Sequence, residues 1–276
     1  MNMKKIILSF AIIISVSAYA GNPDKNFIFK KPSSTTPDKN DKKLSVGLAV
    51  GLSTPLQEYG STTSSSDTTH TVGYAKAGFH YNVTVNYKFS KYVGAMFMLG
   101  GNVNGVNTNA ISSSLNSGGF SFPATIKASG PHYVGQYLVG PCLSVLLTSK
   151  FFIEVRALIG FTHAGYPKIS QNISYSYPGY FSLNSSIDTK PNGGVGLGYN
   201  FGAGAKYILG EHLAATFFID YAGSSITYKG TTSSYSYVET SPQTGTQSSA
   251  GTTNSTTHLK MSLGLLNINA GLAYSF

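Results

Sequence analysis

Histidines are the side chains of this sequence best suited to proton-transfer chemistry near neutral pH. Five of the six lie in or beside segments rich in Ser, Thr and Gly: His70, His80, His132, His163 and His258. A histidine beside a serine and a carboxylate could support acyl transfer or hydrolysis, and a histidine pair could bind a metal ion. No fixed His–Ser–acid spacing occurs, however, and Asp and Glu are scarce near these positions. We therefore predict no catalytic residue and no metal site.

Two further motifs have simpler structural explanations. Cys142 is the only cysteine, so an intrachain disulfide is excluded, and we expect a small side chain packed in a strand. The segment GGVGLGYNFGAG, residues 193–204, contains glycine spacings similar to those of nucleotide-binding loops. No helical pattern follows it, and close strand packing explains these glycines better. No cofactor is predicted.

Four charged residues alternate with apolar ones in three consecutive strand-like segments. Glu154 and Arg156 lie opposite an apolar set in the first, Lys206 in the second and Asp220 in the third. An unpaired buried charge costs several kcal/mol, so charges on an inner face must pair. We predict that these four residues form a charge network inside the protein. Lys76, Lys88 and Gln136 are expected to help fill the same interior.

The first residues indicate secretion. A basic MNMKK, an apolar IILSFAIIISV and the sequence Ala18-Tyr19-Ala20 together predict a signal peptide over residues 1–20. Residues 21–43 are rich in Pro, Ser, Thr and Lys, which predicts a flexible basic linker on the periplasmic side. Residues 44–276 form the remaining domain.

The composition of that domain is unlike that of a water-soluble protein. Charged residues make up 11% of the chain, against about 25% in ordinary soluble domains, so the outer surface is not expected to face water. The formal net charge of +9 is partly carried by the linker and otherwise scattered. This distribution argues against nucleic-acid binding and favours attraction to anionic lipid headgroups.

Alternation of apolar and polar residues with a period of two predicts strands, because a helix would repeat at three and four. We expect eight strands, over residues 44–54, 74–89, 93–103, 132–147, 151–163, 195–208, 213–228 and 258–276. The connections SKY, TSK and GEH are short, whereas the others are long and rich in Ser, Thr, Tyr and Gly. Eight strands of about ten or more residues are long enough to cross a bilayer as a closed barrel.

The two faces of these strands differ enough to orient the barrel. One face is rich in Phe, Tyr, Leu and Val, and the other is rich in Gly, Asn and Ser. Small residues suit the narrow interior of an eight-stranded barrel, so the apolar face is predicted to meet lipid and the interior to be filled without a wide pore. A girdle of Tyr and Phe is expected at the strand ends.

The last strand, LNINAGLAYSF, and the strand-turn-strand segments NYKFSKYVGAMF and LLTSKFFIEVRA resemble those of small eight-stranded outer-membrane β-barrel proteins of Gram-negative bacteria. The resemblance covers the chain from about Leu44. It implies an all-β, closed, antiparallel, up-and-down transmembrane barrel with short periplasmic turns and long extracellular loops. It also implies that Phe276, Tyr274 and Leu272 act as a signal for the outer-membrane assembly machinery, and that the partners include outer-membrane lipid and lipopolysaccharide.

For function, the leading hypothesis is a non-enzymatic outer-membrane protein that contributes to envelope structure and to surface adhesion through its Ser/Thr-rich loops. Such loops suit binding of an extracellular glycan or protein, and equally suit solvation without a partner. Three alternatives stay open: a lipid A-modifying acyl hydrolase or transferase, passage of a small or hydrophobic solute, and a soluble secreted barrel.

Overall fold

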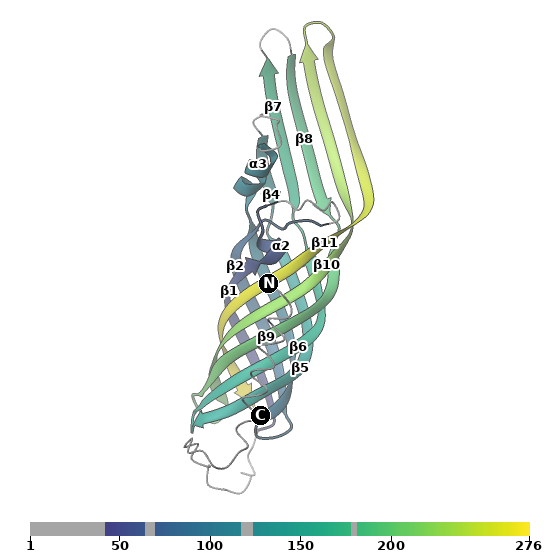
Figure 1. Ribbon diagram of the computed structural model, residues 1–276. Coiled ribbons are helices and arrows are strands. Elements are labelled where there is room, and N and C mark those ends of the chain that lie inside the picture. Colours follow the sequence, from purple (N-terminus) through teal and green to yellow (C-terminus); the bar gives the residue numbers. More distant parts are fainter. Residues whose placement is uncertain (1–41, 64–69, 117–123, 178–180) are drawn as a thin grey trace. The chain divides into compact units, whose positions relative to one another are not determined.

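The computed structural model describes residues 42–63, 70–116, 124–177 and 181–276. The predicted signal peptide and all but the last two residues of the predicted linker lie outside these ranges. Residues 42–276 form one compact unit. Its described part is almost entirely antiparallel β-sheet, with two short helices, α2 (Gln57–Gly60) and α3 (Thr108–Asn116) (Figure 1). Neither helix has the length and hydropathy needed to span a membrane.

Eight strands form a closed, hydrogen-bonded ring. They are β1 (Leu44–Leu56), β2 (Ala75–Lys88), β3 (Val93–Val106), β5 (His132–Thr148), β6 (Phe151–Gly165), β9 (Gly194–Ile208), β10 (Leu213–Ser241) and β11 (Gly245–Ser275). Each strand pairs with the next, and β1 closes the ring against β11 from Ser45↔Ser275 to Leu56↔Gly264. The predicted closed antiparallel barrel of eight strands is confirmed.

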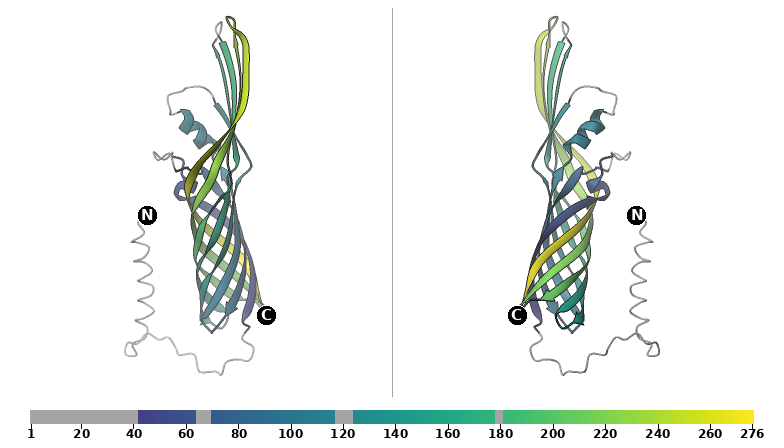
Figure 2. Two further views of the ribbon diagram at one scale, coloured as in Figure 1. Left: turned by 90° about the vertical axis from the view of Figure 1, so that its right-hand side faces the viewer. Right: turned by 90° about the vertical axis from the view of Figure 1, so that its left-hand side faces the viewer.

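The connections differ between the two ends of the barrel. Residues 89–92, 149–150 and 209–212 make short turns at one end, which is also where β1 begins and β11 ends. We call this the short-turn end and the opposite end the long-loop end. Figure 2 shows the same division from two further sides.

The outer wall of the barrel is apolar. Large side chains that point outward are about half exposed, among them Leu52 (68%), Val139 (53%), Ile159 (56%) and Leu197 (63%). On β6 the outward residues Phe151 and Phe161 are ten residues apart, about 33 Å along a strand and about 25 Å in height at a tilt of about 40°. That height matches the apolar band of a barrel in a bilayer. We call this outward-facing band, between the levels of Phe151 and Phe161, the apolar belt.

Aromatic side chains mark the short-turn end of the belt, as the sequence predicted. The outward ones are exposed there: Tyr87, Phe89, Tyr92, Tyr207, Tyr274 and Phe276. Phe152 differs, because it belongs to the inward-facing set of β6 and its ring lies 5.4 Å from the Lys88 ammonium.

Beyond the long-loop end the sheet continues as a flat extension that the sequence did not predict. β4 (Ala124–Ser129), β7 (Lys168–Tyr177) and β8 (Phe181–Pro191) join the distal parts of β10 and β11, in the order β11-β10-β8-β7-β4 (Figure 1). We call this five-stranded sheet (124–129, 168–177, 181–191, 231–241 and 245–255) the blade. The expectation of long loops here was wrong for these segments: Ser- and Thr-rich sequence forms strands because pairing of β8 with β10, of β7 with β8 and of β4 with β7 satisfies the backbone hydrogen bonds.

Candidate functional site

The barrel interior is filled by side chains around one buried ion pair. Arg156 donates to both carboxylate oxygens of Asp220, at 2.9 Å and 2.6 Å, and both side chains are at most 3% exposed. The register explains the meeting, since Arg156 and Asp220 both pair with Gly202, which lacks a side chain between them. Asn269 donates a third hydrogen bond to Asp220 at 2.8 Å. The Arg156 guanidinium also lies 4.2 Å from the centre of the Phe218 ring.

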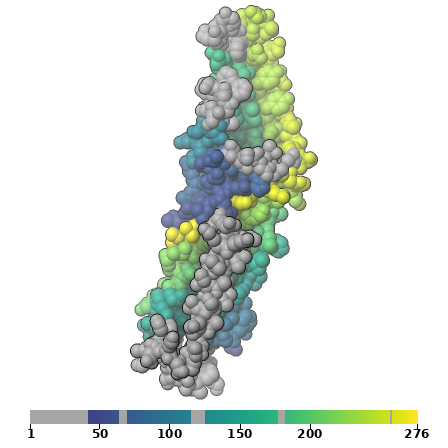
Figure 3. All heavy atoms as spheres, in the orientation of Figure 1, coloured from purple at the N-terminus to yellow at the C-terminus, as the bar shows by residue number. Residues whose placement is uncertain are grey.

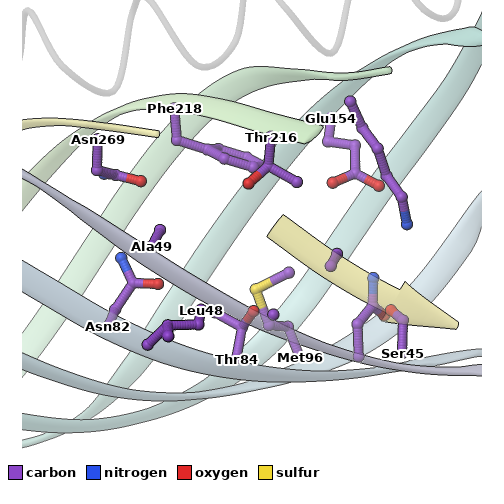
Figure 4. A pocket seen from close by; sticks show the side chains of 14 residues that line it. Ser45, Leu48, Ala49, Asn82, Thr84, Met96, Glu154, Thr216, Phe218 and Asn269 are labelled. Carbon is purple, nitrogen blue, oxygen red and sulfur yellow. The ribbon is translucent and has the colours of Figure 1, made fainter. Parts of the chain in front are cut away.

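The other two predicted charges lie nearer the short-turn end. Glu154 and Lys206 are both 6% exposed, and both line a cavity of ≈ 30 Å³ (Figure 4). Glu154 accepts a hydrogen bond from Ser144 at 2.5 Å. No ion pair joins Glu154 to Lys206 in the described part of the chain. The predicted network of four is therefore observed as one bidentate pair and two neighbouring buried charges.

Buried amides and hydroxyls lie around the ion pair and continue toward the long-loop end. Several of their polar atoms lack a protein partner in the described residues: Asn102 Nδ2, both polar atoms of Gln136 and of Asn267, Thr162 Oγ1, Asn200 Oδ1 and Asn269 Oδ1. Buried polar groups without protein partners are normally satisfied by ordered water. Met96, Met98, Leu138 and Leu158 form an apolar cluster beside this layer. Buried polar and apolar side chains thus line this level of the described interior.

Aromatic residues close the barrel at the long-loop end. Tyr59 of α2 meets His132 edge to face at 5.3 Å, His132 meets Tyr166 at 4.7 Å, and Tyr166 meets Tyr228 at 6.1 Å. We call these four residues the aromatic cap. Leu263, Leu265 and other apolar side chains pack beneath them, which seals this mouth of the barrel.

Contacts of Glu58 in α2 fix the helix that carries Tyr59 of the aromatic cap, and the histidine at the centre of the cap is uncharged. Glu58 of α2 accepts from the Ser262 backbone N–H at 2.5 Å and pairs with His70 at 2.8 Å. Burial lowers the pKa of His132 to about 4, so the imidazole is neutral near pH 7. Burial also raises the pKa values of the Tyr59 and Tyr166 hydroxyls.

Of the five histidines beside Ser-, Thr- and Gly-rich segments, His70 pairs with Glu58, and the other four divide into two groups. His80 and His132 are 1% exposed inside the barrel, and His80 hydrogen-bonds Asn102 and Asn82. His163 and His258 are exposed on the outer surface. No cluster of three or more His, Cys, Asp or Glu residues suited to a metal ion occurs in the described ranges.

One predicted interior residue lies outside. Lys76 is exposed, because the pairing of β2 with β3 shifts between Ala75 and Gly78, and Ala75 turns inward instead. Gln136 is buried in the lumen as expected. At the other end of the chain, Leu272, Tyr274 and Phe276 all point outward and are 51%, 44% and 60% exposed. Their role in assembly stays a prediction.

The two faces of the blade differ in composition. Cross-strand partners and every second residue share a face, so the registers assign each side chain to one side. One side, the apolar blade face, carries all the large aliphatic side chains of β4, β7 and β8 and two tyrosines of β10: Ile126, Ile169, Ile173, Leu183, Ile187, Tyr235 and Tyr237. By the same registers it also carries Gln171, Ser185, Thr189, Ser233 and Glu239. The other side, the polar blade face, is dominated by Ser, Thr and Asn, together with Lys127, Lys168, Asp188 and Lys190. The space-filling view shows the blade extending beyond the barrel (Figure 3). The sequence missed this site, although a period of two in KISQNISY was available as a signal.

No protein-family model matches the sequence, and no curated protein matches it. Among solved structures, a major outer membrane protein from Thermus thermophilus is similar over 85% of this chain and 98% of its own, at 13% identity and a TM-score of 0.35. Ail, the attachment invasion locus protein of Yersinia pestis, is similar over 85% and 99%, at 12% identity and 0.37. The outer membrane protease OmpT from Escherichia coli is similar over 88% and 99%, at 11% identity and 0.26. At such values the likeness carries no argument about activity, and the function must be argued from this chain.

Proposed function

We propose that the protein is a non-enzymatic, integral outer-membrane barrel with a filled lumen, which holds an adhesive β-sheet outside the cell. The observation that carries the proposal is the amphipathic blade. Its strands β10 and β11 continue from the barrel through a register shift between Lys229 and Thr231, and one of its faces bears Ile, Leu and Tyr side chains. A sheet face that is apolar and partly exposed outside the membrane is suited to binding another molecule.

The membrane location is supported by the outer wall. Exposed Phe, Leu, Val and Ile side chains encircle the barrel over about 25 Å, the thickness of a bilayer's apolar band. Water would leave this surface prone to aggregation, whereas hydrocarbon would solvate it. We place the short-turn end in the periplasm and the blade outside the cell, because barrels of this kind have short periplasmic turns and longer extracellular connections.

Adhesion can be tested by changing one face of the blade at a time. Ile187→Ser combined with Tyr237→Ser removes two side chains from the apolar blade face, and Val238→Ser is the matched control on the polar blade face of the same strand. We expect cells that express the double variant to be retained on immobilised host-cell protein and glycan surfaces at least tenfold less than cells with the natural protein. Cells that express the control variant should be retained as well as cells with the natural protein. Equal retention of both variants, with both proteins folded at the surface, would reject adhesion through this face.

Conductance recordings in planar bilayers test whether the lumen is filled. The ion pair, the amide layer and the aromatic cap lie in series along the lumen, so we expect no large stable conductance. The same protein, incubated with lipid A and examined by mass spectrometry, should leave the acylation pattern unchanged. A discrete conductance would favour solute passage, and altered acylation would favour the enzyme hypothesis.

A further inference from the structure

A pocket on the outer surface lies where the barrel wall meets the blade. It has a volume of ≈ 320 Å³ and lies between the start of β7 and the end of β8. Tyr133, Tyr166, Lys168 and Lys190 line it together with three prolines, at positions 131, 167 and 191. Prolines have few backbone conformations, and Pro167 and Pro191 are buried, so the walls are preorganised.

The pocket carries an unbalanced positive charge. The β7–β8 pairing begins at Ile169↔Thr189, and Lys168 and Lys190 flank that pair and line the same pocket. Like charges close together on a sheet are destabilising, so an anion beside them is favourable. Asp188 supplies one, at 2.8 Å from Lys168. Lys190 is exposed and has no ion-pair partner in the described part of the chain.

The surroundings do not neutralise Lys190 either. Beyond the belt on this side, the described residues include six lysines: 76, 127, 168, 190, 229 and 260. Only three acids accompany them, of which Glu58 pairs with His70, Asp188 pairs with Lys168, and Glu239 lies near the tip of β10. The pocket therefore has a positive potential that an external anion would lower.

The height of the pocket above the apolar belt indicates what kind of anion could bind in it. Tyr133 on β5 points outward and is 56% exposed, four residues beyond the outward-facing Tyr137, which pairs with Phe161 at the edge of the apolar belt. Four residues span about 13 Å along a strand, or about 10 Å in height at the usual tilt. Headgroups occupy this layer just outside the hydrocarbon.

We propose that this pocket binds a phosphate group on the saccharide headgroup of an outer-leaflet glycolipid, with Lys190 and Lys168 as the cationic contacts. The inference rests on the proposed outer-membrane location and adds a defined lipid site to it. Tyr133 and the prolines supply apolar surface beside the charges, which suits a sugar ring that carries a phosphate. Lysine binds phosphate as a point charge, so no bidentate geometry is required.

The test measures binding of fluorescently labelled rough-type lipopolysaccharide to the folded full-length chain in a zwitterionic detergent. Each lysine near an anionic surface contributes about 1 kcal/mol, so Lys190→Gln should weaken binding about fivefold. Asp188→Asn frees Lys168 from its internal partner and should tighten binding about fivefold. Lys150→Gln is the matched control, since it removes an exposed lysine at the short-turn end and should change nothing.

The source of the phosphate is distinguished by two further ligands. Dephosphorylated lipopolysaccharide should bind at least tenfold more weakly, and millimolar inorganic phosphate should compete poorly. An unchanged affinity of Lys190→Gln, equal binding of the dephosphorylated lipid, or displacement by inorganic phosphate as efficient as by lipopolysaccharide would each overturn the proposal. Incorporation of the protein into phosphatidylcholine vesicles tests the membrane location separately, so the two can fail independently.

Discussion

Replacing Asp220 by Asn would leave Arg156 charged inside the barrel with no anion to pair with. The two side chains are 3% and 1% exposed, and two short hydrogen bonds join them. Breaking a buried ion pair from one side costs about 3–5 kcal/mol, because the remaining charge is neither solvated nor paired. We expect Asp220→Asn to lower the free energy of unfolding by about this amount, since Asn has nearly the same volume as Asp and creates no cavity.

The measurement is a urea titration of the refolded barrel in detergent, with folded and unfolded fractions separated by heat-modifiable migration in a gel. The double variant Arg156→Met with Asp220→Leu provides the control. It removes both charges and keeps the volume, so it should recover most of the lost stability, although Asn269 loses an acceptor and retains a cost of about 1 kcal/mol. If Asp220→Asn lies within about 1 kcal/mol of the natural protein, or if the double variant is the less stable of the two, the reasoning about this pair is wrong.

Three other predictions test separate parts of the interior and the chain end. A side chain at Gly202 would collide with Asp220 Oδ1, so Gly202→Ala should destabilise the barrel measurably in the same titration, whereas Gly135→Ala, with open space around it, should not. His132 has a pKa of about 4 in the fold against about 6.5 unfolded, so the unfolded form binds the extra proton as the pH falls. The aromatic cap should therefore lose up to about 3 kcal/mol of stability between pH 6.5 and pH 4. Backbone hydrogen exchange at residues 57–60 should become faster over that range in the natural protein and stay constant in His132→Gln. Removal of Phe276 should reduce the amount of folded protein in outer-membrane fractions, and an undiminished yield would argue against its role as an assembly signal.

The barrel was predictable because its outer wall imposes a strict rule on the sequence. Alternate residues must be apolar wherever a strand faces hydrocarbon, and runs such as 151–161 obey this rule throughout. The side of each charge followed from the same parity, which is why Glu154, Arg156, Lys206 and Asp220 were all assigned to the interior. The choice of partners did not follow, because it depends on the stagger between strands that aligns Arg156, Gly202 and Asp220.

The alternation of apolar and polar residues fails as a guide at a shift in strand pairing and in strands that do not face hydrocarbon. A shift in pairing between Ala75 and Gly78 reverses the parity and puts Lys76 outside. In the blade only one face is apolar and both faces are partly exposed, so Ser and Thr dominate and the segments read as loops. The proximity of Lys168 and Lys190, which flank the first β7–β8 pair and line one pocket, could not be predicted before those two strands were known.

The β10–β11 hairpin imposes an order on biogenesis. The β10–β11 ladder runs from Leu213↔Tyr274 to Ser241↔Gly245 with a register shift between Lys229 and Thr231, and β11 also forms the seam with β1. Once β1 and β11 have paired along that seam, the filled lumen is too narrow for the tip of the β10–β11 hairpin to pass through it. In the proposed topology, we therefore expect the distal half of the hairpin to be exported while the ring is still open, and the seam to close in the last step of insertion.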